Sequence, residues 1–128
     1  MSKKAAVTGT WHDKNQQVDF VLPLIMFEED ESKIVYCPAL DLSGYGKNEN
    51  DATDSFKIVL DEYLIYTTRK QSLVADLKAL GWRTVKKGKE LVPPDMALLL
   101  NQNQNFSRIF NSHDFRKTTT SISLPIYS

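Results

Sequence analysis

Apolar residues alternate with other residues from Val18 to Phe27, and this is the first clear pattern in the chain. The even positions of this segment are all apolar, which is the period-two signature of a strand with one buried face. The odd positions include Val21 and Ile25, so we expect the opposite face of the strand to be covered as well. Pro23 cannot donate a backbone hydrogen bond, which favours an edge position or a local bulge there.

An acidic turn, Glu28 to Glu31, joins this strand to a returning strand at Lys33 to Cys37. The following loop contains Gly44 and Gly46 on either side of one tyrosine, which predicts a sharp bend or a positive φ. A further strand is expected before the first one, at Ala5 to Trp11.

A long helix is predicted from Glu49 to Arg69. Asn48 is a good N-cap, and Asp51, three residues later, occupies the place of a capping-box acid. Acidic residues in the first turn and basic residues in the last turn suit the helix dipole. One stripe at three- and four-residue spacing is apolar and predicts the buried face: Ala52, Phe56, Val59, Leu60, Tyr63 and Leu64.

The second half of the chain predicts shorter elements. A helix from Ser72 to Leu80 ends at Gly81, a plausible C′ glycine. The segments 82–85 and 89–92 are expected to form a hairpin that turns at Lys87-Gly88. A helix follows over 96–110, interrupted by a polar run at 101–105, and the segment 118–126 reads as a final strand.

Together these elements predict an α+β fold. A small antiparallel or mixed sheet carries a long helix on one face, and further helices and a final strand follow. The length of 128 residues suits one domain. Within it we expect a core over 1–70 and a C-terminal extension over 71–128. The apolar second face of the first strand, together with the late strand, favours a homodimer in which a sheet edge is covered.

Composition excludes several classes of protein. With 41% hydrophobic and 25% charged residues, the chain is neither disordered nor repetitive, and no apolar run approaches the roughly 20 residues that span a bilayer. The N-terminus lacks the apolar segment of a signal peptide. The single cysteine, Cys37, excludes an internal disulfide and fits a reducing compartment, so we expect a cytoplasmic protein.

The net charge of zero conceals an asymmetry between the two halves of the chain. Residues 1–64 hold 12 acidic and 6 basic residues, whereas residues 65–128 hold 4 acidic and 10 basic residues. The asymmetry indicates either a charged partner or head-to-tail self-association, or else two halves that interleave in space and cancel.

Residues 18–70 resemble the HicB-like antitoxin domain family. The resemblance lies in the order of strand, acidic turn and strand, then the turn Tyr36-Cys37-Pro38-Ala39-Leu40-Asp41, then the helix entry from Gly46 to Ala52. In that entry Asn48 takes the place of a threonine, Asp51 that of the second glutamate, and Ala52 that of the alanine.

The resemblance implies a partial RNase-H-like α+β sheet. In toxin–antitoxin members such a domain covers the active site of a small ribonuclease toxin, so the resemblance also implies a protein partner. The operator-binding module that often follows is not expected, because the chain ends at Ser128 directly after its last predicted strand.

No residue constellation predicts catalysis. His12 and His113 are far apart in sequence and lack partners at metal-binding spacing, so a solvated surface role is expected for both. Cys37 reads as a small, half-buried core residue, and the acids 28–31 read as a solvated turn. We therefore expect no enzyme activity, no metal and no cofactor.

The alternative to a protein partner is a nucleic acid. The predicted hairpin carries a basic cluster of Arg83, Lys86, Lys87 and Lys89, with Trp82 nearby as a stacking platform. Such a cluster can follow a phosphate backbone. Basic residues on a hairpin can equally form a solvated edge that discourages sheet association, and a tryptophan after a helix-ending glycine can equally belong to the core.

Overall fold

A computed structural model describes residues 17–85 and 90–125, and the strand predicted at 5–11 lies outside them. The strands are β1 (Gln17–Glu29), β2 (Ser32–Cys37), β3 (Leu42–Gly46), β4 (Arg83–Val85), β5 (Glu90–Val92) and β6 (Phe115–Pro125). The helices are α1 (Glu49–Lys70), α2 (Leu73–Ala79), α3 (Met96–Gln102) and α4 (Gln104–Ser112). The predicted α+β fold is confirmed.

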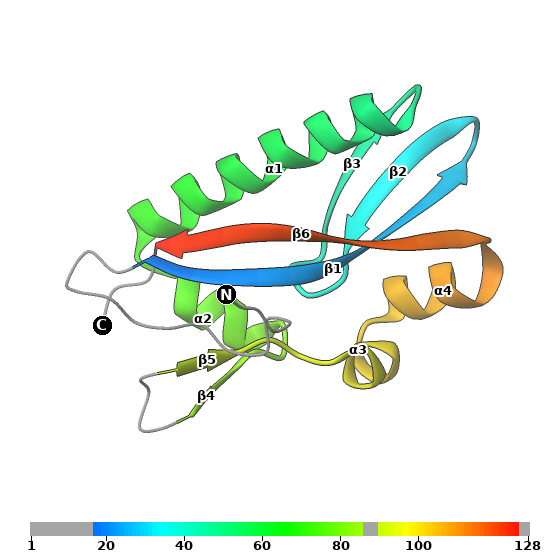
Figure 1. Cartoon of the computed structure of the whole chain (residues 1–128). Coiled ribbons are helices and arrows are strands. Elements are labelled where there is room, and N and C mark those ends of the chain that lie inside the picture. The colour runs from blue at the N-terminus through cyan, green and yellow to red at the C-terminus, as the bar shows by residue number, and fades with distance from the viewer. Residues whose placement is uncertain (1–16, 86–89, 126–128) are drawn as a thin grey trace.

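The main sheet is antiparallel and has the order β3-β2-β1-β6 (Figure 1). β1 pairs with β6 along its length, from Gln17↔Pro125 to Phe27↔Phe115, but with β2 only from Ile25 onward. Pro23 therefore lies where β1 has a single partner strand, which is the edge-like position that its missing donor favours. The C-terminal strand thus belongs to the same sheet as the first strand.

The turn between β1 and β2 is a two-residue hairpin loop. Glu29 pairs with Ser32, and both loop residues are left-handed, with φ of 54° at Asp30 and 66° at Glu31. Positive φ at both positions is the geometry of the type I′ turn, which matches the twist of antiparallel strands.

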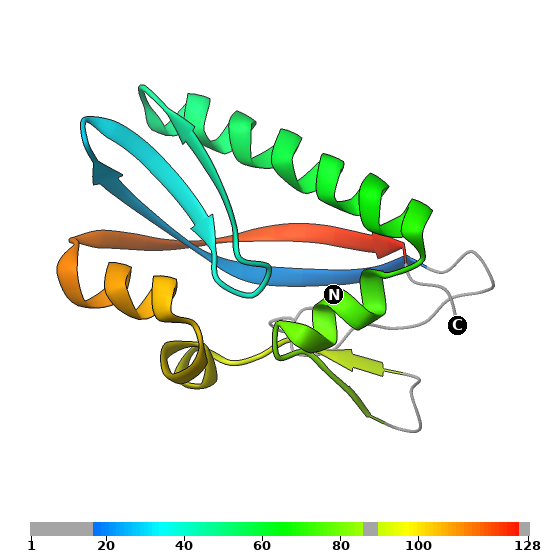
Figure 2. The same cartoon turned by 180° about the vertical axis from the view of Figure 1, so that it is seen from behind.

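Helices cover both faces of the sheet, with α1 on one side and α3 and α4 on the other (Figures 1 and 2). The predicted stripe of α1 is buried at Ala52, Phe56 and Leu60, which share a core cluster with Phe20 and Leu22 of β1. The expected packing of this helix on the alternating strand is therefore confirmed.

Gly44 and Gly46 let the α1 backbone approach β3 closely. A Cβ at Gly44 would lie 2.2 Å from the amide nitrogen of Phe56 and 2.6 Å from the carbonyl oxygen of Ala52. A Cβ at Gly46 would lie 2.4 Å from the amide nitrogen of Ala52. The expected bend or positive φ is wrong, because both glycines lie in the strand β3 and, of the glycines in the described residues, only Gly81 has a positive φ.

A second core lies on the opposite face. Ile25 and Phe27 of β1 join side chains of β2, α3 and α4 there, so the prediction that this face is covered is confirmed. The predicted single helix over 96–110 is wrong, because the chain breaks at Asn103. The Asn103 side chain caps α4 by accepting from the amide of Phe106 at 3.0 Å, and it donates to the Tyr36 hydroxyl at 2.8 Å.

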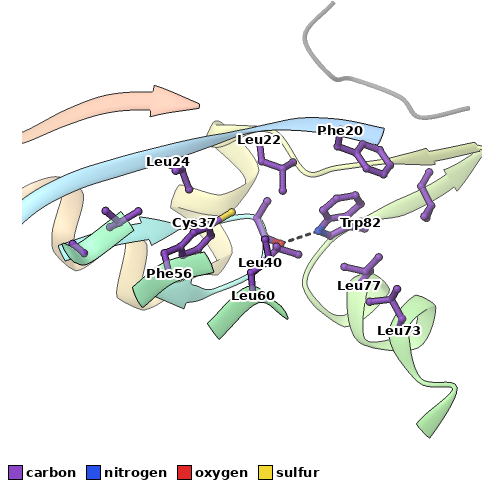
Figure 3. Packing of buried hydrophobic residues seen from close by; sticks show 14 residues of the cluster. Phe20, Leu22, Leu24, Cys37, Leu40, Phe56, Leu60, Leu73, Leu77 and Trp82 are labelled. Atoms are coloured by element: carbon purple, nitrogen blue, oxygen red, sulfur yellow. Dashed lines mark hydrogen bonds between the residues drawn. The ribbon is translucent and has the colours of Figure 1, made fainter. Parts of the chain in front are cut away.

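α2 and the β4–β5 hairpin close the far end of the first core. α2 ends, as predicted, before Gly81, whose φ is 103°. Trp82 is 2% exposed, meets the Phe20 ring edge-on, and donates from Nε1 to the Ala39 carbonyl at 2.8 Å (Figure 3). This bond ties the turn after β2 to a residue 43 positions later.

We expect Gly44→Ala to lower the free energy of unfolding by about 1–3 kcal/mol, because the added methyl group meets rigid helix backbone. Urea denaturation measures the change. Ser43→Ala on the same strand is the matched control, because Ser43 borders the opposite face of the sheet, and it should stay within about 0.5 kcal/mol of wild type. Equal stability of the two variants would contradict the close contact.

We expect Asn103→Ala to lower the free energy of unfolding by about 2 kcal/mol, since it removes both a helix cap and a hydrogen bond to a buried tyrosine. Asn101→Ala, an exposed change in the neighbouring helix, should be neutral or slightly stabilising. Thermal and urea unfolding of both variants decide the matter, and a neutral Asn103→Ala would rule out the bridging role.

Candidate interaction surface

The outward face of α1 carries large apolar side chains that the fold does not bury. Ile58 is 60% exposed, Ile65 is 53% exposed and Tyr66 is 59% exposed. Ile58 and Ile65 are two turns apart on the side of the helix opposite Phe56 and Leu60. The helix is thus apolar on two opposite sides, of which the packing of the fold uses one.

Acidic side chains flank this apolar face. Asp54 and Glu62 lie four residues before and after Ile58, and Asp61 lies four residues before Ile65, so each is a surface neighbour of an exposed isoleucine. All three acids are exposed, and Lys57 is the basic residue among them. We call the set of Ile58, Ile65, Tyr66 and these flanking acids the α1 outer face.

Tyr66 is held in place by the last turn of the helix. The Lys70 ammonium donates to the Tyr66 hydroxyl at 3.1 Å and lies 4.6 Å from the centre of its ring. This bond raises the pKa of Lys70, so the lysine remains a cation at the end of the α1 outer face. The charge along the α1 outer face therefore changes from negative before Tyr66 to positive after it, at Arg69 and Lys70.

Two open depressions lie at the end of the sheet next to α4, and the larger one extends to the start of α1. The larger, about 530 Å³, includes Glu49 and Arg116, which form an ion pair. The smaller, about 370 Å³, includes Glu29 and Arg108, whose charged atoms are 3.7 Å apart. These pairs join the acidic half of the chain to the basic half, which is the interleaved arrangement that the sequence left open.

A polar cluster beside the smaller depression fixes β2 to α4. The Tyr36 hydroxyl donates to Asp41 at 2.5 Å and accepts from Asn103 at 2.8 Å. Burial, and then the bond to Asp41, raise the pKa of Tyr36 far above its ordinary value. Because the Tyr36 phenol stays protonated and already makes one hydrogen bond as a donor and one as an acceptor, its role is to stabilise the second core.

The sequence-predicted chemical groups are not brought together. Cys37 is fully buried at the end of β2, deeper than the half-buried position predicted, and burial raises the pKa of its thiol to about 12. His113 follows α4, as expected, but the predicted solvated role is wrong. Its ring packs on Phe27 with centroids 5.1 Å apart, and its Nε2 lies 3.7 Å from Glu29. His12 lies outside the described residues.

The acidic turn is only partly solvated. Asp30 and Glu31 are exposed at its tip, as predicted. Glu28 is also exposed, as predicted, and its carboxylate pairs with Lys33 at 3.1 Å. Glu29 is half-buried and lies between Arg108 and His113 of the α4 region. Of the four acids, Glu29 is therefore the one that departs from the predicted solvated turn.

The predicted basic hairpin is described only in part. Arg83 is exposed on β4, whereas Lys86, Lys87 and Lys89 lie outside the described residues. The proposed stacking role of Trp82 is wrong, because its indole is buried and its only donor is used within the core. Nucleic-acid binding by the hairpin stays a prediction that rests on charge alone.

The residues that carry the family resemblance have structural roles. Pro38 is buried in the turn after β2, where the amide of Asp41 donates to the Cys37 carbonyl at 2.8 Å. Asn48 caps α1 as predicted, accepting from the amide of Asp51 at 2.8 Å. Gly44, Gly46 and Ala52 form the close contact between β3 and α1.

The α1 outer face is absent from the sequence-based predictions. Its signal is present in the sequence, since Ile58 and Ile65 fall outside the predicted apolar stripe while Asp54, Asp61 and Glu62 surround them. Single exposed apolar residues are common on protein surfaces, so it is the occurrence of Ile58, Ile65 and Tyr66 on one helix that makes this surface a candidate.

We expect the Cys37 thiol to be inert in the folded protein at pH 8, because burial keeps it protonated. An aromatic disulfide reagent should label it only after unfolding in urea, which serves as the positive control. Since the folded thiol keeps its proton to about pH 12 while the unfolded thiol ionises near pH 9.0, the free energy of unfolding should fall as pH rises through this window. Fast labelling of the native protein would contradict the burial.

The part of the chain that the structure describes contains no group of three His, Cys, Asp or Glu side chains that could hold a metal ion. None of its helices is long and apolar enough to cross a membrane. Comparisons with protein-family models, curated proteins and solved structures find no match to this chain.

Proposed function

We propose that this chain is a HicB-like binding protein that acts by protein–protein contact rather than by catalysis. The role that its resemblance suggests is the antitoxin of a toxin–antitoxin pair, or a relative of such antitoxins. The order of three antiparallel strands followed by a capped helix on one face supports the proposal. So does the use of the resembling residues for a turn, a cap and a close helix contact rather than for chemistry.

The observation that carries the proposal is the exposure of Ile58, Ile65 and Tyr66 on one helix. Full burial of a large apolar side chain is worth about 1.5–3 kcal/mol, so these three side chains offer a partner a substantial driving force. They lie on a rigid helix that is fixed to the sheet by backbone contact at Gly44 and Gly46. An apolar face preorganised in this way suits helix-mediated recognition.

The charges around the apolar face indicate the chemistry of the partner. Asp54, Asp61 and Glu62 would repel an acidic surface and attract a basic one. Two copies of α1 that paired antiparallel, with Ile58 against Ile65, would place Asp61 against Glu62 of the other copy, and Asp54 against Arg69. We assign the α1 outer face to a small basic protein because acids lie four residues before and after Ile58, whereas basic residues gather only after Ile65.

Self-association belongs to the same proposal. The sequence predicts a sheet edge covered in a homodimer, and the α1 outer face leaves that edge free to serve this purpose. The protein would then present its helix surface to a foreign partner and its sheet edge to itself.

The test begins with the neighbouring short reading frame, which should encode a basic protein with a Gly-Ser-His motif. We expect that product to bind this chain, and Ile58→Ser and Ile65→Ser each to weaken binding by about tenfold, since truncation of a central apolar contact costs about 1–2 kcal/mol. Titration calorimetry measures the affinity, and growth under co-expression reports neutralisation.

Tyr45→Ser is the matched control. Tyr45 is 59% exposed, like the α1 residues, but it borders the depression on the opposite face of the sheet, so its loss should leave the affinity unchanged. Exposed substitutions of this kind leave stability within about 0.5 kcal/mol, so a loss of binding reports contact rather than unfolding. Absence of such a frame, or binding that the isoleucine variants do not weaken, contradicts the antitoxin role.

A further inference from the structure

β6 forms an open edge of the main sheet. Within residues 17–85 and 90–125 it pairs with β1 alone, over all 11 of its residues. Arg116 to Thr119 and Ser121 are exposed, so side chains on both faces of the strand meet solvent. A strand of this length presents a long row of backbone donors and acceptors on its outer side.

The other edge of the sheet is protected. β3 has five residues, and α1 follows it after a short turn and lies against its backbone at Gly44 and Gly46. The Ser55 hydroxyl of α1 also accepts a hydrogen bond from the amide of Tyr45 at 3.2 Å. Among the described residues, α1 thus occupies the Tyr45 amide at the β3 edge, whereas no strand or helix occupies the backbone of the β6 edge.

The middle of β6 lacks the usual defences against pairing. Natural edge strands carry lysine, proline or bulges at positions where another strand would dock. Here Arg116 and Lys117 stand at the beginning and Pro125 at the end, while the seven residues 118–124 contain neither charge nor proline. Threonine, which fills positions 118–120, has high strand propensity and forms favourable cross-strand pairs.

We infer that the β6 edge is the seam of a homodimer, in which β6 pairs antiparallel with β6 of a second copy about a two-fold axis at Thr120. This register overlaps all 11 residues from Phe115 to Pro125. This inference rests on the self-association that is part of the proposed function, and it does not require any foreign partner. The axis places Thr119 opposite Ser121 of the other copy.

The charges of β6 select this direction. In a parallel pair, Arg116 and Lys117 would each lie about 5 Å from their own copies, and like charges directly opposite each other are destabilising. In the antiparallel pair, the two Arg116 positions are eight residues apart along the seam, roughly 26 Å, well beyond the Debye length. Antiparallel pairing also closes the assembly after two copies.

The dimer would have a continuous sheet in the order β3-β2-β1-β6-β6-β1-β2-β3. Because the two-fold axis is perpendicular to the sheet, both copies of α1 lie on the same side of it, so that two α1 outer faces are presented together. A seam of one strand pair buries less than the roughly 1,600 Å² of a standard interface, so we expect micromolar affinity.

The direct test is a Thr120→Cys variant, which introduces a near-isosteric thiol at the axis. Residues opposite each other in an antiparallel pair have Cα atoms about 4.5–5.5 Å apart, within the range of a disulfide. The buried Cys37 does not compete, since its thiol is protonated and enclosed. Mild oxidation should give a disulfide-linked dimer, whereas the control Arg116→Cys, on the same strand but far from its copy, should not.

A charge-matched pair of variants tests the register. T119K/S121K places lysine opposite lysine and should weaken dimerisation at least tenfold, whereas T119K/S121E places lysine opposite glutamate and should preserve it. Sedimentation from about 1 to 300 μM measures both. A wild-type protein that stays monomeric over this range, T120C and R116C that cross-link alike, or two double variants that behave alike, each overturns the seam.

Self-association and partner binding can fail separately. Ile58→Ser with Ile65→Ser should leave the dimer intact, because α1 takes no part in the seam. If this double variant dissociates the dimer, the α1 outer face is the self-contact and the β6 seam is wrong. If it abolishes binding of the foreign protein alone, both surfaces have the separate roles assigned to them.

Discussion

The close contact between the backbones of α1 and β3 is the constraint on which the other features depend. At Gly44 the helix lies so near the strand that no side chain larger than hydrogen fits. The contact sets the depth at which Phe56 and Leu60 enter the first core, and Asn48 starts the helix directly after the strand. Because the inward side of α1 is fixed, its outward side is fixed too. The position of Ile58 and Ile65 on the surface is therefore a consequence of two glycines.

The second core is built around β2, whose side chains alternate between the two faces. Val35 and Cys37 belong to the α1 cluster, while Ile34 and Tyr36 belong to the cluster under α3 and α4. Asn103 completes this side by joining a helix start to the Tyr36 hydroxyl. A strand buried on both faces needs no further partner, so within residues 17–85 and 90–125 the free surfaces lie at the β6 edge and on the outer sides of the helices.

Period and capping signals in the sequence predict β1, β2, α1 and their packing, since these depend on local patterns. The strand β3 was not predicted because its glycines are required by the close packing of α1 against the strand rather than by a local turn. The break at Asn103 escapes it for a similar reason, since the hydrogen bond to Tyr36 spans 67 residues. The candidate surface was the least predictable feature. Helical periodicity identifies the buried stripe of α1, and Ile58 and Ile65 lie outside that stripe, so it assigns them neither to the core nor to a functional site.

Those two isoleucines depart from the local rule that solvent-facing helix positions are polar, and such departures concentrate where function lies. The acids beside them add charge to an otherwise apolar patch, and under the proposed function this charge favours a foreign surface of opposite sign. The proposed β6 seam would rely on a different interaction, because this edge offers backbone hydrogen bonds and short hydroxyl side chains. Two surfaces that differ in chemistry and lie on different elements need not compete. On this proposal, one chain would pair with itself and hold a partner at the same time.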